Sequence, residues 1–392
     1  MKDLPDFNFL QDSFIIQANS LLKLPEEAIK AFIESYKVIR SNQSLCRLLW
    51  CNHLSLFNSE ISVNEERQQV KEKLELPSPE QAIGILAGMY PAVLLLSGFD
   101  RLMRFYRRKS ICEKVITDTL NDINIWMKDY YNKHGVWGLG EFWWLFNHFS
   151  GKLFRLDRLQ FIHKQFNGNL VVFRNVTTDK VVALSGAGIR YRADGQVDGT
   201  NGIYDSEGGW TSKLIITENS IKGNPISPFA FAKPDFIELD TQQWVQVLSE
   251  GSPVLEVHIP AGEKLSHEDC GESFKISEKF FNKYFPELPF DGYECSSWLL
   301  DSQLQKILPP SSNIVKFQRE FYLYPIQASD FQTFERVFGS KPDNIKFLKA
   351  ESSLQKAILD YINEGNHMRQ TAMFLLKDEL KHWGEACYQT RS

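Results

Sequence analysis

The sequence predicts an α+β fold: an all-α N-terminal domain followed by a mixed α/β domain with a central, mostly antiparallel sheet. Apolar residues recur at helical spacing up to about residue 136, and no alternating strand pattern appears before about residue 155. Short alternating segments separated by turn pairs then follow. We therefore expect an all-α domain over 1–136, an α/β domain over 137–330, and a C-terminal helical extension over 331–392 packed on the second domain.

Length, charge and cysteine content exclude several classes of protein. A chain of 392 residues exceeds the usual size of a single domain. Its net charge of −5 argues against a general nucleic-acid binder. The six cysteines form no CxxC pair, which fits reduced thiols in a cytosolic protein better than a disulfide framework or a zinc site. We expect a cytoplasmic protein with no metal and no nucleic-acid partner.

The first third of the chain carries clear helix signals. Pro25 opens a helix, and the two glutamates that follow it are favoured by the helix dipole. A core-facing stripe runs from Ile116 to Tyr130 and ends near Gly135, a favoured residue just after a helix. These signals predict the all-α domain.

One uncharged segment, residues 81–99, has just about the minimum length for a membrane span of roughly 20 residues. Pro91 lies near its centre, and proline disrupts a helix interior, so we expect two short buried helices split there. The start of the chain carries acids and a proline where a signal peptide needs a basic and then an apolar stretch. We therefore expect no membrane partner.

A basic stretch follows at residues 101–109, in which Arg101, Arg104 and Arg108 share one helical face. Such a face could hold an anionic group, for example the phosphates of a nucleotide-like cofactor, or an acidic partner protein. It could equally be a solvated helix face.

The segment after residue 137 changes from aromatic helix to short strands. Residues 142–149 predict a helix and residues 153–161 shift to strand character, followed by short strands that begin with 170–174 and 181–185. Seven glycines lie between residues 186 and 209, but their spacing matches neither GxGxxG nor GxxxxGK[ST]. Turn chemistry between strands is the better interpretation of these glycines.

The most informative stretch begins with the strand Val254–Ile259, where Glu256 and His258 project from one face. A carboxylate beside an imidazole is suited to moving protons near neutral pH. A helix follows from Ser266 to about Tyr284, and then a second strand that points Tyr293, Cys295 and Ser297 to one side. The alternative for each of these polar residues is the wet outer face of a half-buried strand.

The C-terminal part of the chain predicts three helical stretches, at 331–338, 352–362 and 368–383. An antiparallel meander, a helix and a strand running parallel to the last meander strand would together precede them.

That order of elements is typical of the GNAT acyltransferase fold, and four segments carry a closer resemblance. They are HIPAGEKLSHEDCGESFKISEKFFNKYFPELPFDGYECSSWLLD at 258–301, LPPSSNIVKFQREFYLYP at 308–325, KLFRLDRLQF at 152–161 and SIKGNPISP at 220–228. They resemble a bacterial family of GNAT-like acyltransferases in which a helical N-terminal domain precedes a divergent GNAT-like domain. The resemblance implies two strands that splay apart to admit the pantetheine arm of acetyl-CoA or a longer acyl-CoA.

The resemblance implies transfer of an acyl group from acyl-coenzyme A to an amine of a small-molecule acceptor. Glu256 or His258 would remove the proton from the amine, and Tyr322 would donate a hydrogen bond to the departing thiolate. Cys295 offers a second mechanism, a covalent acyl-cysteine with His258 as its base. The alternative for Cys295 is a small buried apolar side chain.

The loop after the first strand departs from ordinary GNAT enzymes, which place a glycine-rich turn there to bind pyrophosphate. Here the loop is 260–265, and three acids follow it in the first turns of the helix: Glu268, Asp269 and Glu272. The expected donor-binding residues are Val257, Ile259, Gly262 and Lys264, with Arg101 and Arg108 of the basic helix. The acids also leave open a non-catalytic ligand-binding or interaction module, and a homodimer is a further expectation.

Overall fold

The computed structural model describes residues 7–59, 61, 84–342, 345 and 348–390. The chain divides into two compact units, one of residues 1–162 with 259–263 and the other of residues 163–258 with 264–392. This division differs from the expected boundary at residue 136, because residues 137–162 belong to the first unit. Residues 331–392 belong to the second unit, on which a C-terminal extension was expected to pack.

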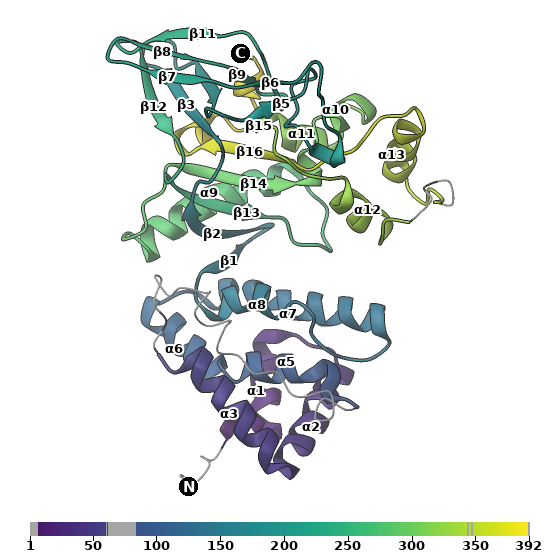
Figure 1. Cartoon of the computed structure of the whole chain (residues 1–392). Coiled ribbons are helices and arrows are strands. Elements are labelled where there is room, and N and C mark those ends of the chain that lie inside the picture. The colour runs from purple at the N-terminus through teal and green to yellow at the C-terminus, as the bar shows by residue number, and fades with distance from the viewer. Residues whose placement is uncertain (1–6, 60, 62–83, 343–344, 346–347, 391–392) are drawn as a thin grey trace. The chain divides into compact units, whose positions relative to one another are not determined.

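The first unit is helical, as expected (Figure 1). Its helices and strands are α1 (Asp12–Leu22), α2 (Glu26–Ser41), α3 (Gln43–Phe57), α5 (Leu86–Leu96), α6 (Phe99–Lys109), α7 (Glu113–His134), α8 (Phe142–Phe149), β1 (Leu153–Leu156) and the first half of β2 (Leu159–Gln165), with a 3₁₀ turn at Asn8–Leu10. The long helix α7 ends where expected, because Gly135 has a φ of +71° that favours glycine.

The split expected at Pro91 is wrong. Helix α5 continues through Pro91, and nine of its eleven residues are buried. Proline has no backbone N–H, so the helix lacks one hydrogen bond there, and packing on all sides stabilises the helix despite this loss. The chain breaks instead at Gly98, where an added Cβ atom would lie only 2.6 Å from the Phe57 ring. Residues 81–83 lie outside the described residues. Within the described part of the chain, no helix is long and apolar enough to cross a membrane.

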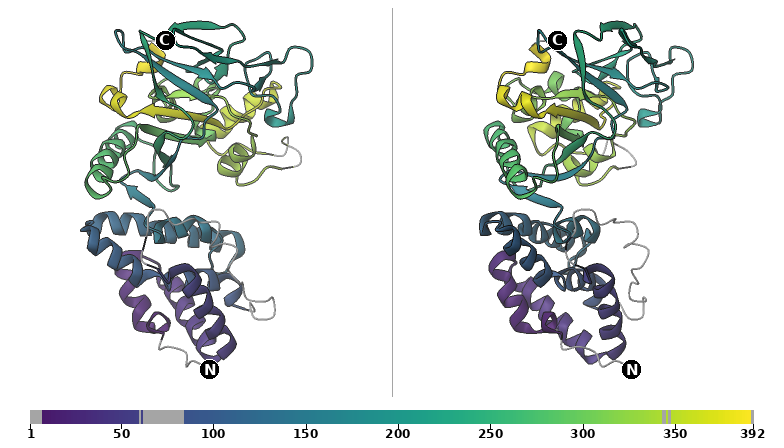
Figure 2. Two further views of the ribbon diagram at one scale, coloured as in Figure 1. Left: turned by 60° about the vertical axis from the view of Figure 1, so that its left-hand side comes forward. Right: turned by 90° about the vertical axis from the view of Figure 1, so that its left-hand side faces the viewer.

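The second unit holds most of the strands in the described chain (Figures 1 and 2). They are β3 (Leu170–Asn175), β4 (Val181–Ser185), β5 (Arg190–Tyr191), β6 (Trp210–Thr211), β7 (Leu214–Ile216), β8 (Ser220–Gly223), β9 (Pro225–Ser227), β10 (Phe231–Ala232), β11 (Ile237–Asp240), β12 (Trp244–Leu248), β13 (Pro253–His258), β14 (Gly292–Ser297), β15 (Tyr322–Tyr324) and β16 (Thr371–Leu376). The helices are α9 (His267–Tyr284), α10 (Leu304–Ile307), α11 (Asn313–Arg319), α12 (Phe331–Phe338), α13 (Ser353–Asn363) and α14 (Cys387–Thr390), with 3₁₀ turns at Thr200–Gly202, Trp298–Leu300 and Lys377–His382.

Two sheets matter most for the site. The strand order is β1-β2-β13-β14-β16-β15 in the larger sheet and β10-β9-β4-β3-β12 in the smaller one. Strands β13 and β14 are parallel, and α9 connects them, which confirms the expected strand–helix–strand order. The remaining registered pairs, β1 with β2, β14 with β16 and β15 with β16, are antiparallel.

Each face of the larger sheet is covered by a different layer. Helix α9 covers one face (Figure 2). There the Tyr293 ring packs edge-on against Phe274, with ring centroids 4.8 Å apart. The smaller sheet covers the other face, because the Tyr322 hydroxyl of β15 donates to the Ile226 carbonyl of β9. Direct cross-strand partners share a face, so Tyr322, Phe374, Glu294 and Glu256 lie in one row beneath the smaller sheet.

The C-terminal helices were predicted only in part. Helices α12 and α13 confirm two of the expected stretches, but the helix expected over 368–383 is wrong. Its first half is β16, all six of whose residues are buried between β14 and β15. A strand buried on both faces reads as a continuous apolar run, and periodicity cannot separate such a run from a buried helix.

Candidate functional site

A cavity of about 580 Å³ opens in the second unit where the larger sheet faces the smaller one. Its floor includes Glu256 of β13 and Glu294 of β14, while Leu170 of β3 and Ile226 of β9 line it from the smaller sheet. Tyr324, at the end of β15, also lines it. The two strands expected to carry the chemistry therefore meet at a cavity.

Three charged side chains line the floor, Lys164, Glu256 and Glu294, and His258 lies beside one of them. Lys164 of β2 places its Nζ atom 3.0 Å from Glu256 Oε1 and 2.6 Å from Glu294 Oε1. His258 Nε2 lies 3.3 Å from Glu256 Oε2, so the carboxylate and imidazole expected on one strand face are neighbours. Their side chains are 29% and 28% exposed, which leaves this pair open to solvent and ligands.

The two carboxyl groups of the floor have opposite pKa shifts. Burial alone would raise the pKa of Glu256, but the hydrogen bond and charge of His258, with the charge of Lys164, outweigh it and lower the pKa to about 2. Burial raises the pKa of Glu294, and the negative charge of Glu256 adds to the increase, although Lys164 limits it. Glu256 is therefore a fixed anion that orients its neighbours, and it is a weak base near neutral pH.

Sequence reasoning missed Lys164 and Glu294. Alternation places Glu294 on the opposite face of its strand from Cys295 but does not mark it as a site residue, and Lys164 lies in a different hairpin 92 residues before Glu256. The register Glu256↔Glu294 brings the two carboxylates side by side. A parallel pairing of the two strands was expected, but the sequence held no signal for its register.

The pairing of β13 with β14 ends at this point. The last paired residues are Glu256 and Glu294, although β13 continues to His258 and β14 continues to Ser297. Beyond Glu256, the backbone of β13 no longer pairs with β14 in the described register. The end of the ladder thus lies at the floor of the cavity, where a splay was expected.

The structure does not favour Tyr322 as the hydrogen-bond donor to a thiolate. Its hydroxyl donates to the Ile226 carbonyl and accepts from the Ala183 N–H at 3.3 Å, both within the smaller sheet. Burial also raises its pKa well above the usual range. The aromatic residue that reaches the cavity from this strand is Tyr324.

The arrangement of Cys295 also argues against a covalent mechanism. Cys295 is among the residues that line the cavity, but strand alternation places its side chain with Tyr293 on the face beneath α9, opposite the face that carries Glu256 and His258. Burial and the neighbouring carboxylates raise the pKa of the thiol strongly, which suppresses the nucleophilic thiolate. The structure fits the interpretation of a small buried apolar residue.

The basic helix α6 does not present Arg101 to a ligand. This side chain is buried in the first unit, where its Nε donates to the Ser59 carbonyl at 2.5 Å and an Nη to the Phe149 carbonyl at 3.2 Å. The expectation of Arg101 as a phosphate ligand is therefore wrong, because its donors hold the helical core together. Arg108 is exposed on the last turn of α6, and its role stays a prediction.

The loop after β13 has a defined anchor. Arg158 donates to the carbonyls of Pro260 at 3.0 Å and Glu263 at 2.9 Å, and Arg155 pairs with the Glu263 carboxylate at 2.7 Å. One acid of the loop is thereby neutralised. Ser266 caps α9 as expected, accepting from the Asp269 N–H at 3.3 Å.

The remaining donor-binding candidates stay predictions. Val257 is buried, Ile259 is half-buried, and Lys264 is exposed at the end of the loop. Gly262 has a φ of +96°, a conformation that favours glycine. Within the described residues, no group of three or more His, Cys, Asp or Glu side chains is placed to hold a metal ion.

Comparison with known proteins identifies the family. A family model described as "GNAT-like C-terminal domain" matches residues 153–375, which is more than half of the chain. A model described as "N-acyltransferase N-terminal domain" matches residues 13–151. A search of curated protein sequences found no match.

Solved structures with the same fold are acyltransferases. One, in complex with decanoyl-CoA and teicoplanin, is 19% identical over 93% of this chain and 88% of that chain, with a TM-score of 0.62. Another, a mutant in complex with octanoyl-CoA, is 19% identical over 92% and 87%, with a TM-score of 0.61. A third, with CoA and 10C-teicoplanin, is 20% identical over the same shares, with a TM-score of 0.61. The chain belongs to the GNAT-like acyltransferase family that joins an N-acyltransferase N-terminal domain to a GNAT-like C-terminal domain.

Proposed function

We propose that the protein transfers an acyl group from acyl-coenzyme A to an amine of a small-molecule acceptor. The observation that carries the proposal is that the pairing of β13 with β14 ends at Glu256. Glu256 lines a cavity of about 580 Å³ and lies beside His258. The family and the neighbours solved with octanoyl-CoA and decanoyl-CoA support this donor, and the neighbour solved with teicoplanin supports a small-molecule acceptor.

In the proposed reaction the acceptor amine attacks the thioester carbonyl carbon. A C–N bond forms, the C–S bond breaks, and the coenzyme leaves as a thiolate. His258 takes the proton that the amine must lose, and ionised Glu256 orients the imidazole and stabilises the imidazolium. For a neutral amine, His258 then returns this proton to the thiolate, so charge and protons balance. An acceptor that arrives as an ammonium ion first releases one further proton to solvent.

Other groups at the floor act on charge and orientation. Backbone N–H groups of β13 beyond Glu256 would stabilise the oxyanion that forms on the thioester oxygen. Tyr324 lines the cavity with a pKa well above the usual range, so it stays protonated as a neutral hydrogen-bond donor. Lys164 holds the two carboxylates of the floor together.

The test uses decanoyl-CoA with a panel of amines, detecting N-acylated products by mass spectrometry and the released coenzyme by its thiol. We expect amide products whose formation His258→Ala reduces strongly while decanoyl-CoA binding persists. Binding of decanoyl-CoA without any thioester turnover would favour the non-catalytic module, which the acids in the first turn of α9 also support. Absence of decanoyl-CoA binding would contradict the proposal.

A further inference from the structure

We infer that the cavity selects a cationic amine that carries no carboxylate or phosphate, and that the glycine-rich segment 186–209 forms the wall responsible for this selection. The inference rests on the proposed function and names the substrate class of the same site. The glycines of this segment form turns, as expected, but the turns also place charged residues at the cavity.

The charges around the cavity are unequal. Among the described residues that line it, two are cations, Lys164 and Arg190, and three are anions, Asp198, Glu256 and Glu294. Lys164 is shared between the two glutamates of the floor. The side chain of Glu294 is only 5% exposed, so this carboxylate is sealed from bulk water and its charge is poorly screened. Counting the lining residues of the floor alone, two carboxylates share one lysine, and His258 lies beside Glu256 outside this lining.

The wall offers no uncommitted cation to an acceptor anion. Arg190 donates from Nε to Asp198 Oδ2 at 3.1 Å and from an Nη to the Asp205 carbonyl at 2.8 Å. Asp198 Oδ1 accepts from the Asp205 N–H at 2.8 Å, which fixes the carboxylate. Arg190 and Asp198 therefore form a neutral pair on the wall.

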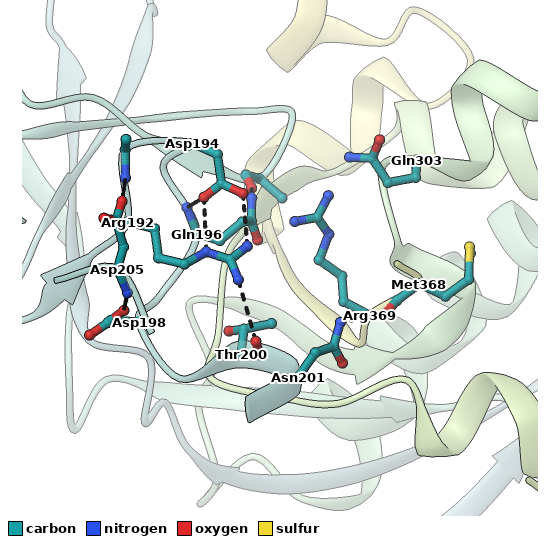
Figure 3. A network of polar contacts seen from close by, with 12 residues as sticks. Arg192, Asp194, Gln196, Asp198, Thr200, Asn201, Asp205, Gln303, Met368 and Arg369 are labelled. Carbon is teal, nitrogen blue, oxygen red and sulfur yellow. Dashed lines mark hydrogen bonds and ion pairs between the residues drawn. The ribbon is translucent and has the colours of Figure 1, made fainter. Parts of the chain in front are cut away.

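The segment is fastened from outside the cavity, so the pair has a fixed place (Figure 3). Arg192 faces Asp194 and pairs with it at 2.8 Å. Asn201 lies beside Met368, donating from Nδ2 to its carbonyl at 2.9 Å, and its backbone N–H donates to the Ala328 carbonyl at 2.8 Å. These contacts fix the backbone that carries Arg190 and Asp198, and the Arg190 side chain, 45% exposed, is held by its pair with Asp198.

An acceptor that brings an ammonium group alone is attracted by the excess carboxylate. One that also brings a carboxylate or phosphate adds a like charge close to Glu256, Glu294 and Asp198 and finds both cations engaged. Since like charges repel, and water screens the buried Glu294 carboxylate little, we expect a preference of about tenfold or more for the amine without the anionic group.

Two matched pairs of amines test the inference: tyramine against tyrosine, and ethanolamine against phosphoethanolamine. Binding of each to the full-length protein is measured by calorimetry, with decanoyl-CoA binding measured in parallel. We expect tyramine and ethanolamine to bind about tenfold or more tightly than their anionic counterparts. Equal or tighter binding of the anionic member, or no binding of any amine by protein that binds decanoyl-CoA, would overturn the inference while leaving the donor site standing. Loss of decanoyl-CoA binding would instead contradict the proposed function.

Variants locate the selectivity in the wall. Asp198→Asn keeps an acceptor for the Asp205 N–H but releases Arg190, so the preference against tyrosine should fall several-fold. Arg190→Gln should increase that preference. Glu238→Gln, on exposed β11, makes the same charge change as Asp198→Asn away from the cavity lining and should leave the preference unchanged. If the preference for tyramine over tyrosine stayed unchanged in both Asp198→Asn and Arg190→Gln, segment 186–209 would not be responsible for the selection, and its proposed role would be refuted.

Discussion

Among the four carboxylate–imidazole pairs that the described residues form, two have opposite surroundings. Asp122 and His148 lie in the helical unit, with Oδ2 and Nε2 at 2.9 Å and side chains 3% and 0% exposed. Glu256 and His258 lie on the sheet of the other unit at 3.3 Å, and more than a quarter of each side chain is exposed. The same two chemical groups are thus sealed in one place and accessible in the other.

The sealed pair is saturated with internal partners. Trp144 Nε1 also donates to Asp122 Oδ2 at 2.7 Å, and His148 Nδ1 contacts the Leu153 carbonyl at 3.1 Å. Burial would raise the pKa of Asp122, but the hydrogen bonds from His148 and Trp144 hold it below its usual range. This pair ties α7, α8 and β1 together and leaves no open position for a substrate.

Beside the exposed pair lie a second carboxylate, Glu294, and Lys164. Glu256 of this pair lines the cavity and is the last residue of β13 that pairs with β14. A carboxylate beside a histidine is therefore not evidence of catalysis by itself. Access and neighbouring charge decide whether the pair holds the fold together or handles protons. Each prediction below separates these two outcomes.

The largest expected effect is a loss of acyl-transfer rate in the variant His258→Ala. Loss of a general base reduces a rate by about 100- to 10,000-fold, and removal of a partly exposed imidazole should leave the fold intact. Steady-state acyl transfer and the thermal midpoint are measured on the same preparation, with His367→Ala, an exposed histidine of the same unit, as control. A variant that keeps wild-type turnover would remove His258 from the chemistry.

Breaking the sealed pair should instead act on stability. Asp122→Ala leaves His148 and Trp144 without their buried acceptor, which costs about 3–5 kcal/mol of unfolding free energy. Urea unfolding followed by fluorescence measures this loss. Turnover per folded molecule should stay near wild type, and a selective loss of turnover would contradict the structural role.

The two tyrosines of β15 allow the same comparison between a residue that stabilises the fold and a residue that lines the cavity. Tyr322→Phe removes the hydroxyl that joins the two sheets and should cost about 1–3 kcal/mol in stability, because a buried carbonyl loses its donor. Tyr324→Phe should lower turnover with little change in stability, since its hydroxyl faces the cavity. Parallel urea and rate measurements on both variants distinguish the roles, and the reverse pattern would restore Tyr322 as the candidate.

The smallest effect is a pH dependence at Glu294. Its raised pKa means that ionisation costs the folded state free energy, which develops as pH rises above the ordinary value of 4.5 and through the folded pKa. Glu294→Gln, which resembles the protonated acid, should therefore gain stability relative to wild type as pH rises from 4 to 8. Glu238→Gln should show no such trend. A difference that stays constant with pH would mean that Glu294 does not have the raised pKa.

Local signals predicted much of this molecule. Alternation located β13 and β14, Ser266 marked the start of α9, and the helical stripe ending at Gly135 gave α7. Glu256 and His258 followed from alternation alone, because period two places residues i and i+2 on one face. These features depend on residues close together in the chain.

The features that the sequence did not predict correctly depend on residues that are far apart in the chain. Lys164 joins the site through a sheet neighbour, Glu294 through the register of parallel strands, and Asp198 through a turn segment read only as turn chemistry. The sequence shows the charge of Arg101, which suggests a phosphate ligand. It does not show the two backbone carbonyls that accept the hydrogen bonds of this side chain in the fold. Strand β16 was read as helix because burial on both faces removes alternation.

The most direct test of the account is a calorimetric titration with decanoyl-CoA of the wild-type protein and of a Glu256→Gln, His258→Ala double variant, followed by thiol release in the same samples after an amine acceptor is added. We predict comparable binding by both proteins and rapid thiol release by the wild type alone. Equal thiol release by both proteins would contradict the assignment of proton transfer to the exposed pair of β13.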